Sequence, residues 1–171
     1  MRIGIVFGCF IPLHSGHISL INRAMFENDI IIIGVCGKDS DRGKDFISFR
    51  TRLKIMQQKY QSGHVKVVPI DDEKLKLDGT FTYSNWIRWG TELFQNANID
   101  PLDTNIQFTW YTGEPSYKAK LGNIYPNHKI ILIDRGINTI SGTKIRNDVE
   151  MYKDEIDKDF LDYIRREKYE I

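Results

Sequence analysis

Apolar residues along this chain gather in short continuous runs instead of alternating with polar ones. β-Branched residues are frequent in these runs, and polar or turn-forming residues separate them. Runs of this kind are typical of strands that are covered on both faces, as in a parallel sheet. The sequence therefore predicts five strands, over residues 3–7, 30–35, 65–70, 106–111 and 129–133.

Segments with helical spacing lie between the predicted strands. The apolar residues that share a helix face are Ile18, Ile21 and Met25, then Phe49, Leu53 and Met56, then Trp86, Trp89, Leu93 and Phe94. A strand–helix alternation repeated five times predicts an α/β fold. We expect an open, doubly wound, five-stranded parallel sheet with right-handed crossovers.

The last segment, residues 147–171, predicts one or two helices that close the fold. Its apolar residues are Met151, Ile156, Phe160, Leu161 and Ile164. The sequence shows no internal repeat, low-complexity stretch or linker. We therefore expect a single domain over residues 1–171 that includes these closing helices.

Composition excludes several classes of partner. The chain has 24 Lys and Arg against 23 Asp and Glu, a net charge of +1, so no global field attracts nucleic acid or an anionic membrane. No apolar run approaches the roughly 18 residues of a membrane span, and Met1 leads into a strand and not into a signal peptide. Cys9 and Cys36 lack the Cys-x-x-Cys spacing of metal sites. We expect reduced thiols in a cytoplasmic protein.

The most informative segment, GCFIPLHSGH at residues 8–17, directly follows the first predicted strand. In an open α/β sheet, ligands bind beyond the carboxyl ends of the strands. Gly8 and Gly16 allow the backbone to approach a ligand closely, and Pro12 stiffens the turn between them. A helix that begins near Ser15 or Gly16 would present backbone N–H groups and a partial positive charge, which suits phosphate.

Two histidines add to this interpretation. His14 and His17 are three residues apart, so on a helical turn both side chains project to the same side and can donate hydrogen bonds to phosphate oxygens. A metal site is disfavoured because the other histidines, His64 and His128, lack suitable spacing. A dinucleotide-binding loop is excluded because no G-x-G-x-x-G occurs here. A purely structural turn is the remaining alternative to a phosphate site.

Two segments resemble signatures of the nucleotidyltransferase superfamily, the relatives of class I aminoacyl-tRNA synthetases. The first, G-x-F-x-P-x-H-x-G-H, is matched by Gly8, Phe10, Pro12, His14, Gly16 and His17. The second, I-S-x-T-x-I-R, is matched within TISGTKIR by Ile140, Ser141, Thr143, Ile145 and Arg146. The resemblance implies a Rossmann-like nucleotidyltransferase fold with the two motifs at the ends of the first and fifth strands.

The second segment also has a physical interpretation of its own. Ser141 or Thr143 can cap the following helix while its first N–H groups face a phosphate. Arg146, one turn later, can offer its guanidinium fork to the β- or γ-phosphate. Taken by itself, the segment is equally compatible with an ordinary capped helix that carries a surface arginine.

Residues 52–61, 78–94 and 111–122 extend the resemblance to the adenylyltransferase domain of NadR-type proteins. Those enzymes join nicotinamide mononucleotide (NMN) to the AMP moiety of ATP and release NAD and pyrophosphate. The resemblance implies the same reaction here, by direct in-line attack without a covalent enzyme intermediate. The chain has no G-x-x-x-x-G-K-[ST], so we expect the kinase of bifunctional relatives to be absent.

The resemblance also assigns roles to individual residues. It implies His14, His17 and Arg146 as catalytic residues. The ATP- or phosphate-binding residues that it implies are Gly8, Phe10, Gly16, Gly113, Glu114, Ser141 and Thr143. No protein metal site is expected, because Mg²⁺ would bridge phosphate oxygens mainly through substrate and water.

The pyridine ring of the acceptor requires an aromatic face. Trp86 is the first candidate and Tyr83 the second, with Phe81 and Trp89 as further ones, because a nicotinamide cation stacks well on such rings. Core packing is the alternative role for both tryptophans.

The loop after the second strand offers a further contact to the acceptor. Arg42, with Asp39 and Asp41, resembles the segment that NadR-type enzymes use near substrate phosphate, and a solvated charged loop is the alternative. Cys9 departs from the pattern, since NadR-type enzymes usually have lysine there. The departure removes a cation from the phosphate site.

Other functions stay open at the level of sequence. One alternative is nucleotidyl transfer to another phosphorylated acceptor, such as phosphopantetheine, glycerol 3-phosphate or a flavin precursor. A second is a non-catalytic sensor that binds NAD or ATP. The sequence does not discriminate NMN from nicotinate mononucleotide, and it leaves the oligomeric state open, a homo-oligomer included.

Overall fold

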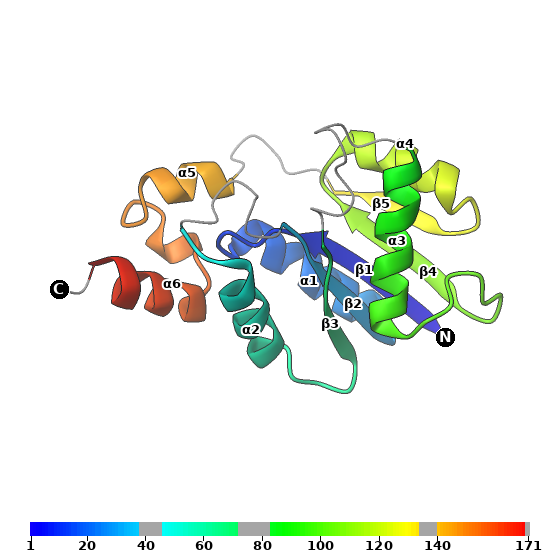
Figure 1. Cartoon of the computed structure of the whole chain (residues 1–171), viewed down its shortest axis with the longest axis horizontal. Coiled ribbons are helices and arrows are strands. Elements are labelled where there is room, and N and C mark those ends of the chain that lie inside the picture. Colours follow the sequence, from blue (N-terminus) through cyan, green and yellow to red (C-terminus); the bar gives the residue numbers. More distant parts are fainter. Residues whose placement is uncertain (38–45, 72–82, 134–139, 170–171) are drawn as a thin grey trace.

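The computed structural model describes residues 1–37, 46–71, 83–133 and 140–169. Within these ranges the core is one parallel sheet of five strands in the order β3-β2-β1-β4-β5 (Figure 1). The strands are β1 (Arg2–Gly8), β2 (Ile30–Val35), β3 (Val65–Pro69), β4 (Gln107–Thr112) and β5 (Lys129–Leu132). The predicted α/β class and all five predicted strands are confirmed, with no end displaced by more than one residue.

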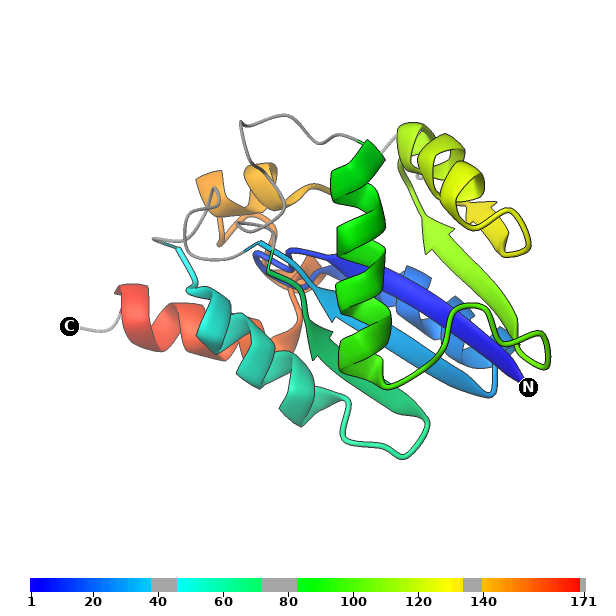
Figure 2. The same cartoon turned by 45° about the vertical axis from the view of Figure 1, so that its right-hand side comes forward.

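Helices cover both faces of the sheet, as Figure 2 shows with α3 in front of the strands and α1 behind them. The α-helices are α1 (Ser15–Glu27), α2 (Phe49–Lys59), α3 (Tyr83–Ala97), α4 (Pro115–Ile124), α5 (Gly142–Asn147) and α6 (Lys158–Ile164). A 3₁₀ turn, η2 (Lys153–Glu155), precedes α6, and a π-helical turn, η3 (Arg165–Tyr169), follows it. The predicted closing helices are therefore confirmed.

Alternation along the central strands divides the core into two layers. Ile3 and Ile5 of β1 pack with the apolar face of α3, whereas Val6 packs with the layer that contains α1 and α6. Successive side chains of a strand point to opposite faces, so a strand covered on both sides needs apolar residues at every position. This requirement explains why the strand sequences form continuous apolar runs.

Two apolar residues of the predicted helix faces are exposed. Met25 is 44% exposed, whereas the predicted Ile21 is fully buried and Ile18 packs partly buried against the same cluster, to which Leu20 and Ala24 also belong. The predicted face of α1 was therefore rotated slightly toward Met25. Ala24 contributes little to an apolar pattern in the sequence, although its small side chain lets the helix approach the strands closely. Met151 is likewise 71% exposed.

A half-buried histidine, His128, directly precedes β5 and stacks on the rings of Phe108 and Tyr125. His128 Nδ1 accepts a hydrogen bond from Trp110 Nε1 at 3.0 Å, and His128 Nε2 lies 2.8 Å from the carbonyl oxygen of Pro101. Because an indole nitrogen only donates, Nδ1 is the acceptor and the proton of the neutral ring is on Nε2. Burial lowers the pKa of His128, and the hydrogen bond to Pro101 only partly offsets that effect.

This geometry predicts that acid weakens the fold through His128. Above pH about 6.5 the ring is neutral in both folded and unfolded states. Below that pH the unfolded chain takes up a proton that the folded chain resists, so the free energy of unfolding falls until the folded-state pKa is passed. Urea unfolding between pH 7.5 and pH 5 should show this loss in the wild type, and His128→Gln should reduce it. His64→Gln, at an exposed histidine, is the control, and an equal pH response in His128→Gln and wild type would contradict the prediction.

Candidate active site

The loop between β1 and α1, residues 9–14, carries most of the first motif. It leaves the sheet at Gly8 and passes through Phe10, which has a φ of 55°, in the left-handed region that bulky residues rarely adopt. Phe10 is 1% exposed, and its ring meets the ring of His17 edge-on with centroids 4.9 Å apart. The structure thus assigns Phe10 a supporting contact with His17.

The two histidines of the motif cap α1 reciprocally. His14 is the N-cap residue, and its Nδ1 accepts from the N–H of Gly16 at 3.1 Å. His17 Nδ1 accepts from the N–H of His14 at 3.4 Å, and the two rings stack with centroids 3.9 Å apart. The predicted placement of both side chains on one side of the first turn is confirmed.

These hydrogen bonds determine which ring nitrogens can donate. A neutral imidazole that accepts at Nδ1 carries its proton on Nε2. Both rings therefore have an Nε2–H donor, next to the N-terminal end of a 13-residue helix. A methyl group built on Gly8 would lie 3.8 Å from His17 Nε2, so glycine keeps the end of β1 open beside this donor. Such donors can neutralise charge on an oxyanion.

The second motif folds as α5 and the turn before it. Ser141 is the N-cap residue of α5 and accepts from the N–H of Lys144 at 3.2 Å. Of the two predicted caps, Ser141 is confirmed. Thr143 Oγ1 instead accepts from Arg146 Nη2 at 3.3 Å, so it braces the guanidinium of this motif.

Arg146 brings the two motifs together although they are far apart in the sequence. Its Nη1 donates to the carbonyl oxygen of Ile11 at 2.8 Å, across 135 positions of the chain. A Cβ atom at Gly142 would lie 2.8 Å from this Nη1 and 3.0 Å from the Ile11 oxygen. Sequence reasoning missed Gly142, which occupies the first of the two variable positions of the motif and is needed for this close approach.

Three alternate carbonyl groups of the motif loop receive hydrogen bonds from three separate elements. Arg52 of α2 donates to Cys9 at 2.6 Å, and Arg146 of α5 donates to Ile11 at 2.8 Å. The third bond runs from the backbone N–H of the residue before α6 to Leu13, at 3.0 Å. Every second residue of the loop from Cys9 to Leu13 is thus fixed by a hydrogen bond from a different part of the fold.

The C-terminal segment makes one further contact with the start of α1 and one with α2. Ser15 Oγ donates to the carboxylate of Glu155 on η2. Asp157 caps α6 and pairs with Lys59 of α2 at 2.5 Å, which ties α6 to α2. The closing helices therefore support the motif loop as well as covering the sheet.

Glu114 lies at the carboxyl end of β4, directly after Gly113. Its carboxylate caps α4, accepting from the N–H and hydroxyl of Ser116 at 3.4 and 3.2 Å, and its own N–H donates to Thr112 Oγ1 at 3.1 Å. Because β4 is the neighbour of β1 in a parallel sheet, both residues lie on the same edge of the sheet as the motifs.

The tryptophans of α3 are core residues. Trp86 is 5% exposed, with its ring centroid 5.0 Å from that of Tyr117 and 5.7 Å from that of Trp89. Lys120 Nζ lies 5.6 Å from the centroid of the Trp86 ring, on the side of α4. Stacking of Trp86 on a pyridine ring stays a prediction.

The remaining acceptor candidates fall elsewhere in the chain. Tyr83 is the first residue of α3, and its side chain is not among the described ones. Arg42, Asp39, Asp41 and Phe81 lie outside the described residues.

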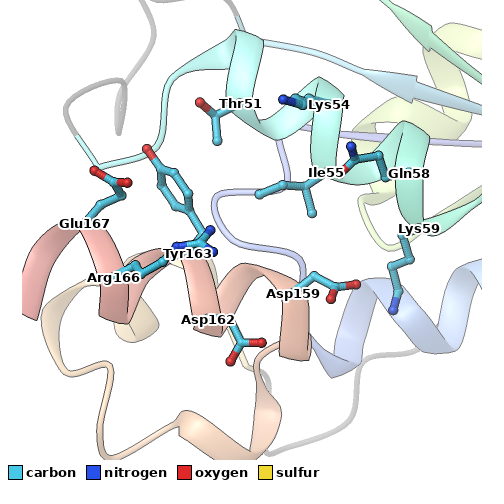
Figure 3. Close-up of a pocket in the computed structure, with 10 residues that line it drawn as sticks. All are labelled: Thr51, Lys54, Ile55, Gln58, Lys59, Asp159, Asp162, Tyr163, Arg166 and Glu167. Carbon is cyan, nitrogen blue, oxygen red and sulfur yellow. The ribbon is translucent and has the colours of Figure 1, made fainter. Parts of the chain in front are cut away.

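A cavity of about 520 Å³ lies between α2 and the C-terminal helices, away from both motifs (Figure 3). Figure 3 shows Tyr163 pointing across it toward Thr51. Its charged lining residues are Lys54, Lys59, Asp159, Asp162, Arg166 and Glu167. Both signs of charge are mixed there, and neither motif contributes a lining residue. The residue types at the carboxyl edge of the sheet, where both motifs lie, therefore suit a phosphate ligand better than the lining of this cavity does.

The described parts of the chain contain neither a cluster of metal-ligating side chains nor a membrane-spanning helix. No group of three or more His, Cys, Asp or Glu side chains there could hold a metal ion, so a role for Mg²⁺ stays a prediction. No helix in these ranges is long and apolar enough to span a bilayer.

Comparison with known proteins gives one family and a consistent set of relatives. The sequence model of the cytidylyltransferase-like family matches residues 5–148. The chain is 30% identical to the trifunctional NAD biosynthesis/regulator protein NadR of Salmonella typhimurium, over 88% of this chain and 38% of that protein.

Solved structures agree with the sequence comparison. A NadR protein in complex with NR superposes with a TM-score of 0.76 at 27% identity, over 91% of this chain and 43% of that one. A bifunctional NMN adenylyltransferase/ADP ribose pyrophosphatase from Francisella tularensis has a TM-score of 0.68 at 17% identity, over 98% of this chain and 50% of that one, and shows the fold alone. The chain spans less than half the length of the NadR proteins that it matches.

The reciprocal cap predicts an unusual response to Gly16→Ala. Replacing glycine by alanine within a helix normally stabilises it by about 0.5–1 kcal/mol. Here the new Cβ would lie 3.0 and 3.1 Å from Cε1 and Nδ1 of His14, a ring that is 4% exposed and stacked on His17. We expect a net loss of about 1 kcal/mol in the free energy of unfolding, because the cap is broken.

Urea unfolding measures this loss, with Gly63→Ala as the matched control. A Cβ atom at Gly63 meets nothing within 4 Å. A Gly16→Ala protein as stable as the wild type would contradict the prediction, because the His14 ring would then move aside without lowering the free energy of unfolding.

Proposed function

The chain belongs to the cytidylyltransferase-like family, and from this premise we propose that it transfers the AMP moiety of ATP to NMN, giving NAD and pyrophosphate. The similarity to NadR proteins, one of them solved in complex with NAD and AMP-PNP, supports a place in NAD biosynthesis. The observation that carries the proposal is the 2.8 Å hydrogen bond between Arg146 and Ile11, which gathers both motifs at one edge of the sheet.

The proposed reaction needs positioning and charge neutralisation, and no protein nucleophile. An oxygen of the NMN 5′-phosphate attacks the α-phosphorus of ATP. The bond from that phosphorus to the bridging oxygen breaks, and pyrophosphate leaves with the electron pair. Phosphoryl and nucleotidyl transfers of this kind are accelerated mainly by holding the reactants in line and by stabilising charge on the phosphate oxygens.

The histidine pair would supply that stabilisation at the α-phosphate. His14 and His17 present Nε2–H donors from one stacked pair, held by hydrogen bonds at their Nδ1 atoms. Their orientation exists before the substrate arrives, so little reorganisation is needed as charge develops. The N–H groups at the start of α1 add a partial positive charge beside Gly16.

The second motif would hold the distal phosphates of ATP. Arg146 already lies against the motif loop, and its Nη2 bond to the exposed Thr143 is long, at 3.3 Å. A phosphate oxygen can replace that neutral partner with a stronger, charge-assisted one. Ser141 would keep the end of α5 in place. Mg²⁺ would be held mainly by the phosphates, since imidazole, hydroxyl and guanidinium groups are not the oxygen anions that it prefers.

This proposal predicts pyrophosphate release from ATP and Mg²⁺ when NMN is the acceptor. Nicotinate mononucleotide, phosphopantetheine and glycerol 3-phosphate complete the panel. His17→Ala should lower kcat by about 10²–10³-fold, because one preorganised donor is lost. His64→Ala, at an exposed histidine, is the matched control.

The panel also separates the alternatives. Turnover with another acceptor would support nucleotidyl transfer as the reaction but contradict NMN as the substrate. Silence with every acceptor despite clear binding of ATP or NAD would contradict catalysis and leave a nucleotide sensor.

The contact between the motifs predicts that Gly142→Ala impairs the use of ATP. The new methyl group would displace Arg146 Nη1 and press on the backbone at Ile11, so the guanidinium leaves its place between the motifs. We expect the KM for ATP to rise about tenfold, the value of one lost charge-assisted hydrogen bond. Steady-state kinetics with Gly63→Ala as the control measures this effect. An unchanged KM for ATP would contradict the proposed contact of Arg146 with the phosphates of ATP.

A further inference from the structure

Arg52 is a fully buried cation that contacts the motif loop without belonging to either motif. The residue lies on α2 and is 0% exposed. To residues that the structure describes, its guanidinium donates four hydrogen bonds to backbone carbonyl groups. The bonds run from Nε to Ile47 at 3.1 Å, from Nη1 to Cys9 at 2.6 Å and to Cys36 at 2.9 Å, and from Nη2 to Gly37.

Only an arginine can make this set of contacts. Its planar fork places donors in three directions at once, so one side chain reaches the ends of β1 and β2 and the segment before α2. A lysine ammonium has the same charge on a single nitrogen and cannot span these carbonyls. A buried charge is stabilised only where hydrogen bonds replace its lost hydration, and the four carbonyls supply them.

The contact with Cys9 acts on the first motif. Cys9 directly precedes Phe10, whose ring supports the ring of His17. The ladder between β1 and β2 continues to this point, because the N–H of Cys36 donates to Gly8 at 2.9 Å. Arg52 Nη1 then takes the next carbonyl on each side, at Cys9 and Cys36, where the two chains separate.

We propose that Arg52 is a positioning residue for the histidine pair. Its guanidinium fixes the carbonyl group of Cys9, and through Phe10 it sets the place of the His17 imidazole. The role concerns the reaction proposed above, and so rests on that function for its kinetic consequence. Its structural consequence, the placement of His14 and His17, can be measured without any substrate.

The kinetic test uses two substitutions at Arg52. Arg52→Lys keeps the charge and loses the fork, and we expect kcat to fall about 100-fold while the KM for ATP changes less than about threefold, as for reactants held slightly out of line. Arg52→Ala should lose activity and recover it saturably in millimolar guanidinium chloride, whereas urea, which has the same shape without the charge, should not restore it. Arg23→Ala, which removes an exposed partner of Glu27 on α1, is the control.

The structural test reads the imidazole ¹⁵N resonances of histidine-labelled protein. The chain has four histidines, and His128 at the start of β5 is an internal reference for intact folding. In Arg52→Lys we expect displaced resonances for His14 and His17 and an unchanged one for His128. In Arg52→Ala, guanidinium should return the two displaced resonances to their wild-type positions.

The outcomes discriminate positioning from mere stabilisation. Wild-type kcat in Arg52→Lys, or a loss of activity with His14 and His17 resonances in place, would overturn the proposal. Displacement of all four resonances would assign Arg52 a general packing role and would also overturn it. If the wild-type chain releases no pyrophosphate with any acceptor, the proposed function fails, and the resonances alone decide whether Arg52 positions the histidines.

Discussion

The site depends on hydrogen bonds to alternate carbonyl groups of one short loop. Cys9, Ile11 and Leu13 each accept a bond from a different element, two of them from arginines. A loop with only local contacts would sample many backbone conformations, and fixing each residue costs on the order of 1–2 kcal/mol. Here hydrogen bonds from distant elements offset that entropic cost. The packing of α2, α5 and the C-terminal segment therefore fixes the loop, and with it the positions of the two histidines.

The histidines have a structural and a chemical role at once. Each Nδ1 accepts a backbone N–H at the start of α1, and this bond leaves the proton on Nε2. Capping thus selects the tautomer that can donate to a phosphate. Arg146 has a similar double role: its Nη1 donates to the carbonyl oxygen of Ile11, and its Nη2 donates to the exposed hydroxyl of Thr143.

Most of the fold could be predicted from the sequence because its signals are local. Continuous apolar runs identified all five strands, and helical spacing identified α3 with its buried face. On α2 it identified the buried Met56 and the partly buried Phe49 and Leu53, and missed the buried Arg52. The face of α1 was correct at Ile18 and Ile21 and wrong at Met25, which is exposed. Ala24 adds little to any apolar pattern, yet it belongs to the buried core. The cap by Ser141 was within reach of local reasoning, whereas the cap by His14 was not, because histidine is not among the usual N-cap residues.

The sequence by itself determined the class of fold, the two motifs and the chemistry that their residue types allow. Only the tertiary structure decided which groups meet: Arg146 with Ile11, Arg52 with Cys9 and Cys36, and the residue before α6 with Leu13 of the motif loop. Each of these contacts joins backbone carbonyls to donors that are distant along the chain. A carbonyl group is present in every residue, so no pattern of side chains marks the ones that will be used. Their selection follows from the order of the strands and the packing of helices on the sheet.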